Sequence, residues 1–322
     1  MDFLQISQPV AADFEKMNKT IIDELSSEVT LIEQIAKHII SSGGKRLRPL
    51  ITLLSSRASG YQGSGHICVA AIIEFFHTST LLHDDVVDES NLRRGKPTAN
   101  ATWGNAASVL VGDFLLSRAF QLAVHTKNIK LLEVLAETTR KISEGEVMQL
   151  SNCKNPHITE NEYMKTIQYK TAVLFQTAAQ LGAIVGDASK TLETALASYG
   201  AHLGCAFQLI DDSLDYRGSV KEMGKNIGDD LSEGKPTLPL IYTLKHGSNA
   251  DKNLIQNAIR TGGLSNIEEI TESIQKCGAL EYTFQLARIE IEKSIKMLGT
   301  LDPSIYKDAL IQLAQASLDR CQ

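Results

Sequence analysis

The sequence has few cysteines, and their placement excludes two classes of small cross-linked protein. Five cysteines are scattered through 322 residues, their number is odd, and no two form a C-x-x-C pair. This pattern argues against a disulfide framework and against a structural zinc site. It is typical of a protein from a reducing compartment, and we therefore expect a cytoplasmic location.

The chain also lacks an excess of positive charge and a long apolar run. Its formal net charge is −6, which argues against a nucleic-acid-binding surface. No uninterrupted apolar run approaches the ~20 residues of a membrane-spanning helix, and the first residues do not resemble a secretory signal, so we expect no transmembrane segment. A G-x-x-x-x-G-K-[ST] phosphate loop is absent, so a nucleotide site of that type is not supported.

Proline is scarce, and its spacing favours long helices. Seven prolines occur, with none between Pro97 and Pro156 or between Pro156 and Pro236. Apolar residues recur there at helical spacing, few stretches alternate with period two, and no Asn-Gly or Asp-Gly hairpin signal appears. No long polar linker or repeat interrupts the chain. The sequence therefore predicts an all-α fold, with residues 1–322 forming a single large helical domain.

Against this apolar background, carboxylates gather in the stretch TLLHDDVVDESNLRRG, residues 80–95, which holds four acids and two adjacent arginines. On a helix His77, Asp84 and Asp88 would form one stripe, and the two carboxylates, one turn apart, could bind one cation. Like charges at this spacing weaken an isolated helix. For one such cluster, a solvated acidic face is an equally good explanation.

The same pattern recurs in FQLIDDSLDY, residues 207–216. Gln208, Asp211 and Asp215 would share one helix face after another apolar stretch. Two D-D-x-x-D clusters are much harder to explain as surface charge. Mg²⁺ prefers oxygen ligands and normally binds through one or two carboxylates together with substrate phosphates. Facing clusters would therefore hold a diphosphate through shared Mg²⁺ ions.

Basic residues in four further stretches fit a phosphate-containing ligand. Arginine forks and lysine ammonium groups are the usual partners of phosphate, although any one of them alone is better explained as an exposed surface charge. The stretches are SGGKRLRP, NLRRGKP, YKTA and GKNIGDDLSEGKPTLP, and their basic candidates are Lys45, Arg46, Arg48, Arg93, Arg94, Lys170, Lys225 and Lys235.

The sequence resembles the trans-isoprenyl diphosphate synthases, and among them the long-chain type, over nearly its whole length. The resemblance rests on GGKRLRP (43–49), HDDVVDESNLRRGKPTAN (83–100), GNAASVLVGDFLLSRAFQ (104–121), EGEVMQL (144–150), FQLIDDSLDY (207–216) and GKNIGDDLSEGKPTLPL (224–240). It implies an all-α isoprenoid synthase fold around a central cavity, and a homodimer. It also implies Mg²⁺-dependent, head-to-tail addition of isopentenyl diphosphate to an allylic diphosphate, with farnesyl diphosphate as the expected primer.

The resemblance further implies a role for each motif residue. Mg²⁺ would be bound by Asp84, Asp88 and Asp211, with support from Asp85, Asp212 and Asp215. The allylic diphosphate would contact Arg93, Lys170, Lys225 and Lys235. Isopentenyl diphosphate would contact Lys45, Arg48, His77 and Arg94, although His77 could instead be a core histidine. The reacting centre would be lined by Thr171 and Gln208.

Two small residues, Ser79 and Thr80, precede the first acidic motif. In the resembled family, bulky aromatic residues at these positions close the pocket for short products. We therefore expect a product longer than C20, with C40 as the length that the resemblance favours, for use as a quinone side chain.

Two alternatives remain open. A class I terpene cyclase could share the fold and the first acidic motif, but its second metal motif usually mixes Asn, Ser or Thr with acids. A non-catalytic regulatory subunit of a heteromeric synthase typically loses acidic-motif residues, whereas this chain keeps all of them.

Overall fold

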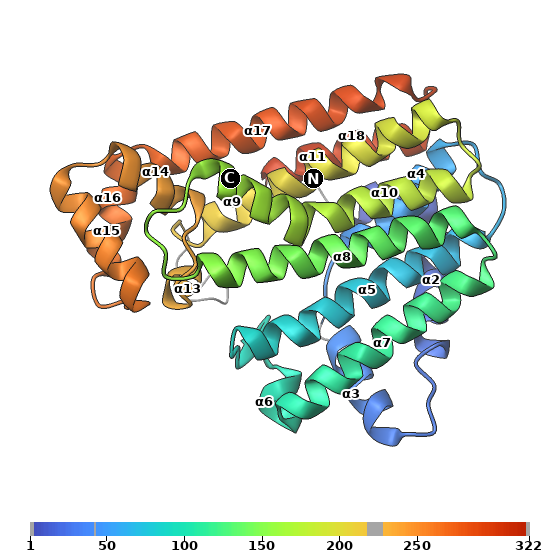
Figure 1. Ribbon diagram of the computed structural model, residues 1–322. Helices are drawn as coiled ribbons and strands as arrows, with labels where there is room; N and C mark the ends of the chain where they lie inside the picture. Colours follow the sequence, from blue (N-terminus) through green and yellow to red (C-terminus); the bar gives the residue numbers. More distant parts are fainter. Residues whose placement is uncertain (1–2, 42, 218–227, 320–322) are drawn as a thin grey trace. The chain divides into compact units, whose positions relative to one another are not determined.

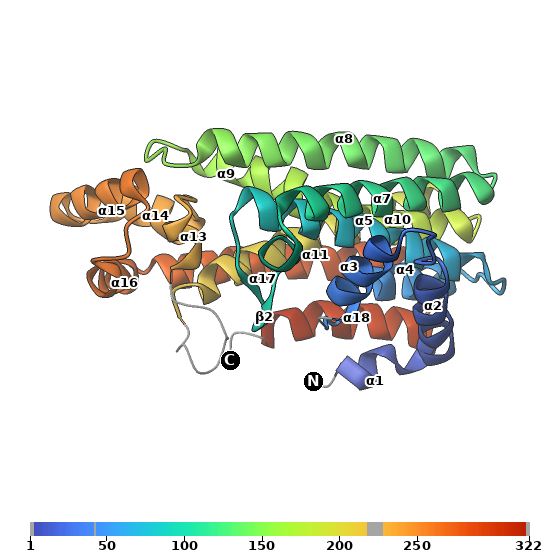
Figure 2. The same cartoon turned by 90° about the horizontal axis from the view of Figure 1, so that it is seen from below.

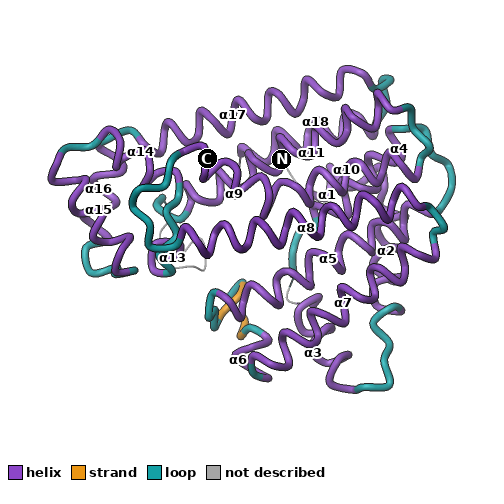
Figure 3. Tube along the Cα trace, in the orientation of Figure 1, coloured by secondary structure: helices purple, strands orange, loops and turns teal. Residues whose placement is uncertain are grey.

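Helices joined by loops and turns make up most of the described chain, and its strands form one short hairpin (Figure 3). The computed structural model describes residues 3–41, 43–217 and 228–319. The prediction of an all-α fold is confirmed. Lys225, one of the predicted diphosphate contacts, lies outside the described residues.

The chain divides into two compact units, each assembled from separate stretches of sequence. Unit 1 comprises Met1–Glu137, Leu174–Gly200 and Met297–Leu313, and unit 2 comprises Thr138–Val173, Ala201–Lys296 and Ala314–Gln322. The colours of Figure 1 follow the sequence, so the segments of each unit can be found there by their residue numbers. That residues 1–322 form one domain stays a prediction.

Unit 1 is built around one long, apolar helix, α5 (Gly65–Val87). This helix packs against α7 (Asn105–His125), α4 (Leu47–Ala58) and α2 (Ala11–Asp23), and α5 and α7 run side by side in Figure 2. The unit also contains α1 (Phe3–Ser7), η1 (Gln8–Val10), α3 (Thr30–Ser41), α6 (Ala99–Trp103), η3 (Leu298–Thr300), and parts of α8 (Ile129–Asn152), α10 (Val173–Val185), α11 (Lys190–Leu214) and α18 (Ile305–Leu318).

Helices α5 and α7 are more apolar on average than the absence of a long unbroken apolar run suggests. Both helices are long and apolar enough, by length and composition, to cross a membrane. The structure buries 72% of the apolar window of α5, as expected for a core helix, but only 39% of that of α7. The core of unit 1 therefore explains the composition of α5, whereas α7 keeps an exposed apolar face.

A short antiparallel hairpin follows α5 and carries the two adjacent arginines. Strand β1 (Leu92–Arg93) pairs with β2 (Lys96–Pro97). The turn residues Arg94 and Gly95 both have positive φ, 54° and 75°, as a type I′ turn requires. The sequence analysis missed this hairpin because arginine occupies the turn position where Asn or Asp would have been the signal.

Unit 2 gathers the later helices around two apolar clusters, one of which includes Tyr163, Ile167, Leu209 and Leu238. The chain enters α9 (Glu160–Ile167) through a capping box formed by Thr159 and Glu162. Further helices are the π-helical η2 (Gln168–Ala172), α13 (Asp229–Ser232), α14 (Leu238–His246), α15 (Asn249–Thr261), α16 (Ile267–Lys276) and α17 (Ala279–Met297), with the remaining parts of α8 and α11.

Candidate active site

The first acidic motif lies at the C-terminal end of α5, and its three aspartates differ in exposure. Asp84 and Asp88 are partly exposed, whereas Asp85 is fully buried. Arg93, on β1, donates to Oδ1 of Asp85 from Nε at 3.0 Å and from Nη2 at 2.7 Å. Asp85 therefore fixes the first hairpin arginine, while the predicted metal ligands Asp84 and Asp88 keep contact with solvent.

The basic residue Arg48 and His77 lie together, as the sequence predicted for one pocket. Nη1 of Arg48 is 3.2 Å from Nε2 of His77, and the guanidinium lies 4.4 Å from the centre of the Phe175 ring. Because a guanidinium can only donate, Nε2 of His77 is the acceptor and the imidazole is neutral. Burial, and after it the charges of Arg48, Arg93 and Arg94, hold the pKa of His77 well below its ordinary value.

A buried acid, Glu74, balances this cluster of cations, and the sequence analysis missed it. Glu74 lies one turn before His77 on α5, with Oε1 3.8 Å from Nε of Arg46. Burial raises its pKa, and Arg46, Arg48 and Arg94 oppose that rise. Within the described residues, Oε2 of Glu74 and Nε of Arg48 are buried without a hydrogen-bond partner. A single acid inside an apolar helix was the signal that could have identified Glu74.

Gly44, the second residue of the glycine pair, has a steric role beside Arg94, the second hairpin arginine. A Cβ atom on Gly44 would lie 2.5 Å from Nη1 of Arg94, whereas a Cβ on Gly43 would meet nothing within 4 Å. Gly44 therefore permits the close approach of Arg94. The next residue, Lys45, is exposed.

In unit 2, Lys170 and Thr171 occupy the wide turn of η2. A Cβ on Gly145 of α8 would lie 2.5 Å from the backbone nitrogen of Lys170, so glycine permits the two segments to touch. Nζ of Lys170 donates to Glu146 at 2.7 Å and to Gln149 at 2.5 Å. Isolated π-turns frequently occur at functional sites. No periodicity in the sequence indicated this one.

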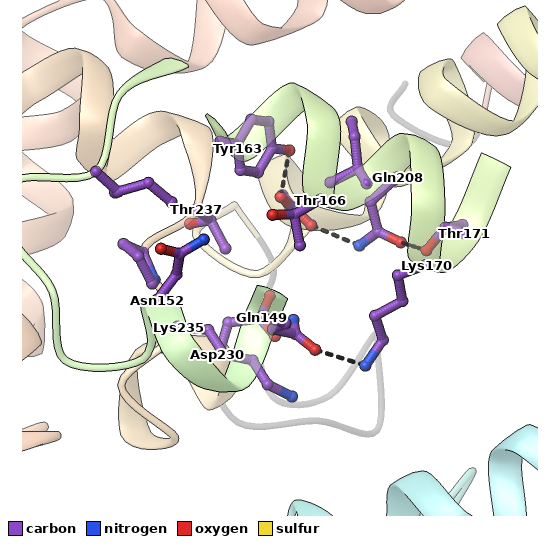
Figure 4. A pocket seen from close by; sticks show the side chains of 14 residues that line it. Gln149, Asn152, Tyr163, Thr166, Lys170, Thr171, Gln208, Asp230, Lys235 and Thr237 are labelled. Atoms are coloured by element: carbon purple, nitrogen blue, oxygen red, sulfur yellow. Dashed lines mark hydrogen bonds between the residues drawn. The ribbon is translucent and has the colours of Figure 1, made fainter. Parts of the chain in front are cut away.

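Four side chains form a continuous hydrogen-bonded chain in unit 2 (Figure 4). Tyr163 donates to Oδ2 of Asp212 at 2.5 Å, Nε2 of Gln208 donates to Oδ1 of Asp212 at 2.7 Å, and Thr171 donates to Oε1 of Gln208 at 2.9 Å. Burial raises the pKa of Asp212, as does the carboxylate of Asp230, while both hydrogen bonds oppose the rise. The second aspartate of this motif is thus buried and bonded by protein donors, as Asp85 is in the first.

The other two aspartates of the second motif have different surroundings. Asp211 is partly exposed. Asp215 is only 9% exposed, and its two oxygens accept hydrogen bonds from the backbone nitrogens of Asp229 at 3.2 Å and Asp230 at 3.3 Å. Asp215 therefore binds the first turn of α13, where backbone N–H groups attract an anion.

A pocket partly open to solvent lies beside these groups in unit 2 (Figure 4). Lys235, which forms an ion pair with Glu233, lines it. Five of the lining residues are predicted from the sequence: Lys170, Thr171, Gln208, Asp212 and Lys235. Polar lining residues that the sequence does not predict include Tyr163, Asp230, Gln149, Asn152 and Thr166.

The carboxylate chemistry fits a hard divalent cation, because the predicted ligands Asp84, Asp88 and Asp211 offer only oxygen. Among the residues that the structure describes, no three His, Cys, Asp or Glu side chains gather to hold a metal on protein ligands alone. Asp84 and Asp88 belong to unit 1 and Asp211 to unit 2. Their convergence on shared ions stays a prediction.

The two residues predicted to set product length face different surroundings. Ser79 is 2% exposed, and its hydroxyl donates to the carbonyl of Gly112 on α7 at 2.8 Å. Thr80 is partly exposed and donates to the carbonyl of His77 at 2.8 Å. Ser79 therefore packs between the two helices, and Thr80 is the more accessible of the pair.

Comparisons with known proteins agree with this geometry. Residues 29–277 match the polyprenyl synthetase family. The chain is 49% identical to octaprenyl diphosphate synthase of Escherichia coli K12, over 99% of each chain, and 46% identical to an all-trans-nonaprenyl-diphosphate synthase of Rhodobacter capsulatus, over 100% of this chain and 99% of that one. A crystal structure of a Caulobacter crescentus CB15 polyprenyl synthase, in complex with calcium and isoprenyl diphosphate, superposes with a TM-score of 0.96 at 41% identity, covering 100% of this chain and 98% of that one. These matches confirm the isoprenoid synthase fold.

Proposed function

This chain belongs to the polyprenyl synthetase family and is a long-chain trans polyprenyl diphosphate synthase, a prenyltransferase, and we propose that it acts with Mg²⁺ on isopentenyl diphosphate and farnesyl diphosphate. The family uses divalent metal ions. The observation that carries the proposal is the pairing of acidic and cationic groups inside each unit. Unit 1 contains the carboxylates of Asp84 and Asp88 together with three arginines, Arg48, Arg93 and Arg94. Unit 2 contains the carboxylate of Asp211 together with Lys170 and Lys235.

The cations of unit 1 divide between the two diphosphates. Arg48 and Arg94, with exposed Lys45 and neutral His77, bind isopentenyl diphosphate through charge-assisted hydrogen bonds to its phosphate oxygens. Arg93 binds the allylic diphosphate with the part of its guanidinium that Asp85 leaves accessible. Glu74 keeps the neighbouring arginines in place without cancelling their charge.

The groups of unit 2 bind the allylic diphosphate and surround the reacting carbon. Lys170, Lys235 and Lys225, which lies outside the described residues, contact the diphosphate oxygens. Asp84, Asp88 and Asp211 would hold Mg²⁺, which would supply charge that stabilises the departing pyrophosphate. Thr171 and Gln208 line the reacting centre, with support from Asp212 and Asp215.

The reaction needs alignment and charge stabilisation more than a side-chain base. The allylic C–O bond breaks and its electron pair leaves with pyrophosphate, while lysine and arginine side chains stabilise the negative charge that develops. The double bond of isopentenyl diphosphate, held close by its own pocket, attacks the allylic carbon. The proton then lost passes to the released pyrophosphate.

The small residues Ser79 and Thr80 support a product longer than C20, and we propose C40 for use in a quinone side chain. Repeated additions of isopentenyl diphosphate would lengthen the prenyl chain of the product beyond these residues. Aromatic side chains at either position would stop it early.

A homodimer in the cytoplasm is the state that we propose for the protein. α7 exposes Val109, Leu110 and Val124, and less than half of its apolar window is buried within the chain. An exposed apolar helix face of this kind marks an interaction surface, and a second copy of the chain would cover it.

The proposal is tested by assaying the purified chain alone, with isopentenyl and farnesyl diphosphates and Mg²⁺. We expect turnover without a partner protein, loss of turnover on chelation, and a decrease of about 10² or more in kcat for Asp84→Ala, with an unchanged circular dichroism spectrum. Inactivity until a second protein is added would indicate the regulatory subunit. A cyclic hydrocarbon formed from farnesyl diphosphate would indicate a terpene cyclase.

A further inference from the structure

Tyr163 is a buried residue next to the pocket of unit 2 that the proposed reaction leaves without a role. It is 5% exposed, lies on α9, and its hydroxyl reaches Oδ2 of Asp212 on α11 at 2.5 Å. Burial, and after it the charge of Asp212, raise the pKa of Tyr163 well above its ordinary value. The phenol therefore keeps its proton at neutral pH and acts as the donor in this hydrogen bond.

The hydrogen bond from Tyr163 to Asp212 determines how the next two side chains in the series, Gln208 and Thr171, are oriented. With Tyr163 on Oδ2, the remaining oxygen of Asp212 accepts from Nε2 of Gln208 at 2.7 Å. The amide nitrogen of Gln208 is committed to Asp212, so its oxygen must face Thr171, whose hydroxyl donates to it at 2.9 Å. With Asp212 as a carboxylate, which can only accept, the direction of every hydrogen bond from Tyr163 to Thr171 is therefore fixed.

An amide side chain can turn by 180° and exchange its donor and acceptor ends, and a carboxylate held on one side only can rotate. Tyr163, itself part of the pocket lining, opposes both movements by holding Oδ2 of Asp212. Figure 4 shows its ring on the far side of the dashed chain from Thr171. With the hydrogen of Thr171 committed to Gln208, the lone pairs of the threonine oxygen remain as acceptors.

We infer that Tyr163 is a positioning residue of the synthase, which acts through Asp212 to fix the orientation of Gln208 and hence of the Thr171 hydroxyl at the reacting centre. The inference rests on the proposed function. It assigns to Tyr163 an effect on the chemical step and none on the binding of either diphosphate.

The chain offers a closely matched control. Tyr199 is also fully buried and donates through its hydroxyl to a single acceptor, the carbonyl of Leu310, at 2.8 Å. It lies in unit 1 and contacts none of the proposed site residues through this bond. Removal of either hydroxyl deletes one buried hydrogen bond and is expected to lower the melting temperature.

The test compares Tyr163→Phe with Tyr199→Phe under the same conditions. For Tyr163→Phe we expect kcat to fall about 10-fold or more, because a small misplacement of a reacting-centre group slows chemistry strongly. Both KM values, and the rise in melting temperature caused by farnesyl diphosphate, should match the wild type. Tyr199→Phe should keep the wild-type kcat. Equal kcat values for the two variants, or loss of the farnesyl diphosphate shift in Tyr163→Phe, would overturn the inference.

A double-mutant cycle tests whether Tyr163 acts through Gln208. If it does, Tyr163→Phe should lower kcat little further in a Gln208→Leu background, because the amide that it orients is gone. Multiplicative effects would show that Tyr163 acts by another route. If the wild type itself does not turn over isopentenyl diphosphate, the proposed function fails, whereas a normal wild type with an undisturbed Tyr163→Phe overturns the positioning role alone.

Discussion

Arg93 and Asp85, eight residues apart, form a forked ion pair in which the Asp85 side chain is completely buried and the Arg93 side chain is 29% exposed. This difference in burial matters because it decides whether the remaining side chain can become solvated when its partner is removed. Arg93 can turn toward water, but Asp85 cannot.

Removing the exposed partner should therefore be the more damaging change. Arg93→Ala leaves a buried carboxylate without its cation, and we expect a loss of about 3–5 kcal/mol in the free energy of unfolding. Asp85→Ala leaves a cation that can become solvated, and the loss should be smaller. Urea unfolding followed by circular dichroism measures both, and an equal or larger loss for Asp85→Ala would contradict this explanation.

Gly44 should control isopentenyl diphosphate binding through Arg94. In Gly44→Ala the new Cβ would collide with the guanidinium, 2.5 Å away, and Arg94 must move. We expect the KM for isopentenyl diphosphate to rise about 10-fold, as for the loss of one charge-assisted hydrogen bond, with little change in the KM for farnesyl diphosphate. Gly43→Ala is the control, because its positive φ of 88° gives comparable backbone strain without the collision. The same KM change in both variants would refute the role of Arg94.

His77 should make the protein less stable as the pH falls. Its pKa lies well below the ordinary value of 6.5 in the folded state, so below about pH 6.5 the unfolded chain binds the extra proton first. The free energy of unfolding should therefore decrease from pH 7 to pH 5, and His77→Gln should make that decrease shallower. An unaltered slope in His77→Gln would contradict the lowered pKa.

Aromatic residues before the first acidic motif should shorten the product, but at different structural costs. In Ser79→Tyr the ring must enter the contact with Gly112, so we expect shorter products together with a lower melting temperature. Thr80→Tyr, at the more accessible position, should shorten products with a smaller loss of stability. Chromatography of the products decides the matter, and unchanged long products from both variants would remove these residues from the control of length.

Helical periodicity predicted much of the site because it depends only on residue spacing. The stripe of His77, Asp84 and Asp88 leaves Asp85 on another side of α5, and the structure buries it there. Periodicity did not identify the donor to Asp85, because Arg93 reaches that carboxylate only through a hairpin whose turn residues are Arg and Gly.

Contacts between distant segments were beyond the reach of sequence reasoning. Tyr163 acquires its role from Asp212, 49 residues later, and the π-turn at Lys170 accompanies close contact with Gly145 on another helix. Local patterns report which face of a helix is apolar, but they do not report which residue of a second helix will meet it. Glu74 is the exception, because an acid within an apolar helix already implies a buried cation.

The length of the product tests the account most directly. The purified wild-type chain is incubated with farnesyl diphosphate, an excess of isopentenyl diphosphate and Mg²⁺, and the dephosphorylated products are separated by reversed-phase chromatography beside all-trans standards. We expect a main product that is longer than C20 and has the proposed length of C40. A main product of C20 or shorter, or no product from the chain alone, would contradict it.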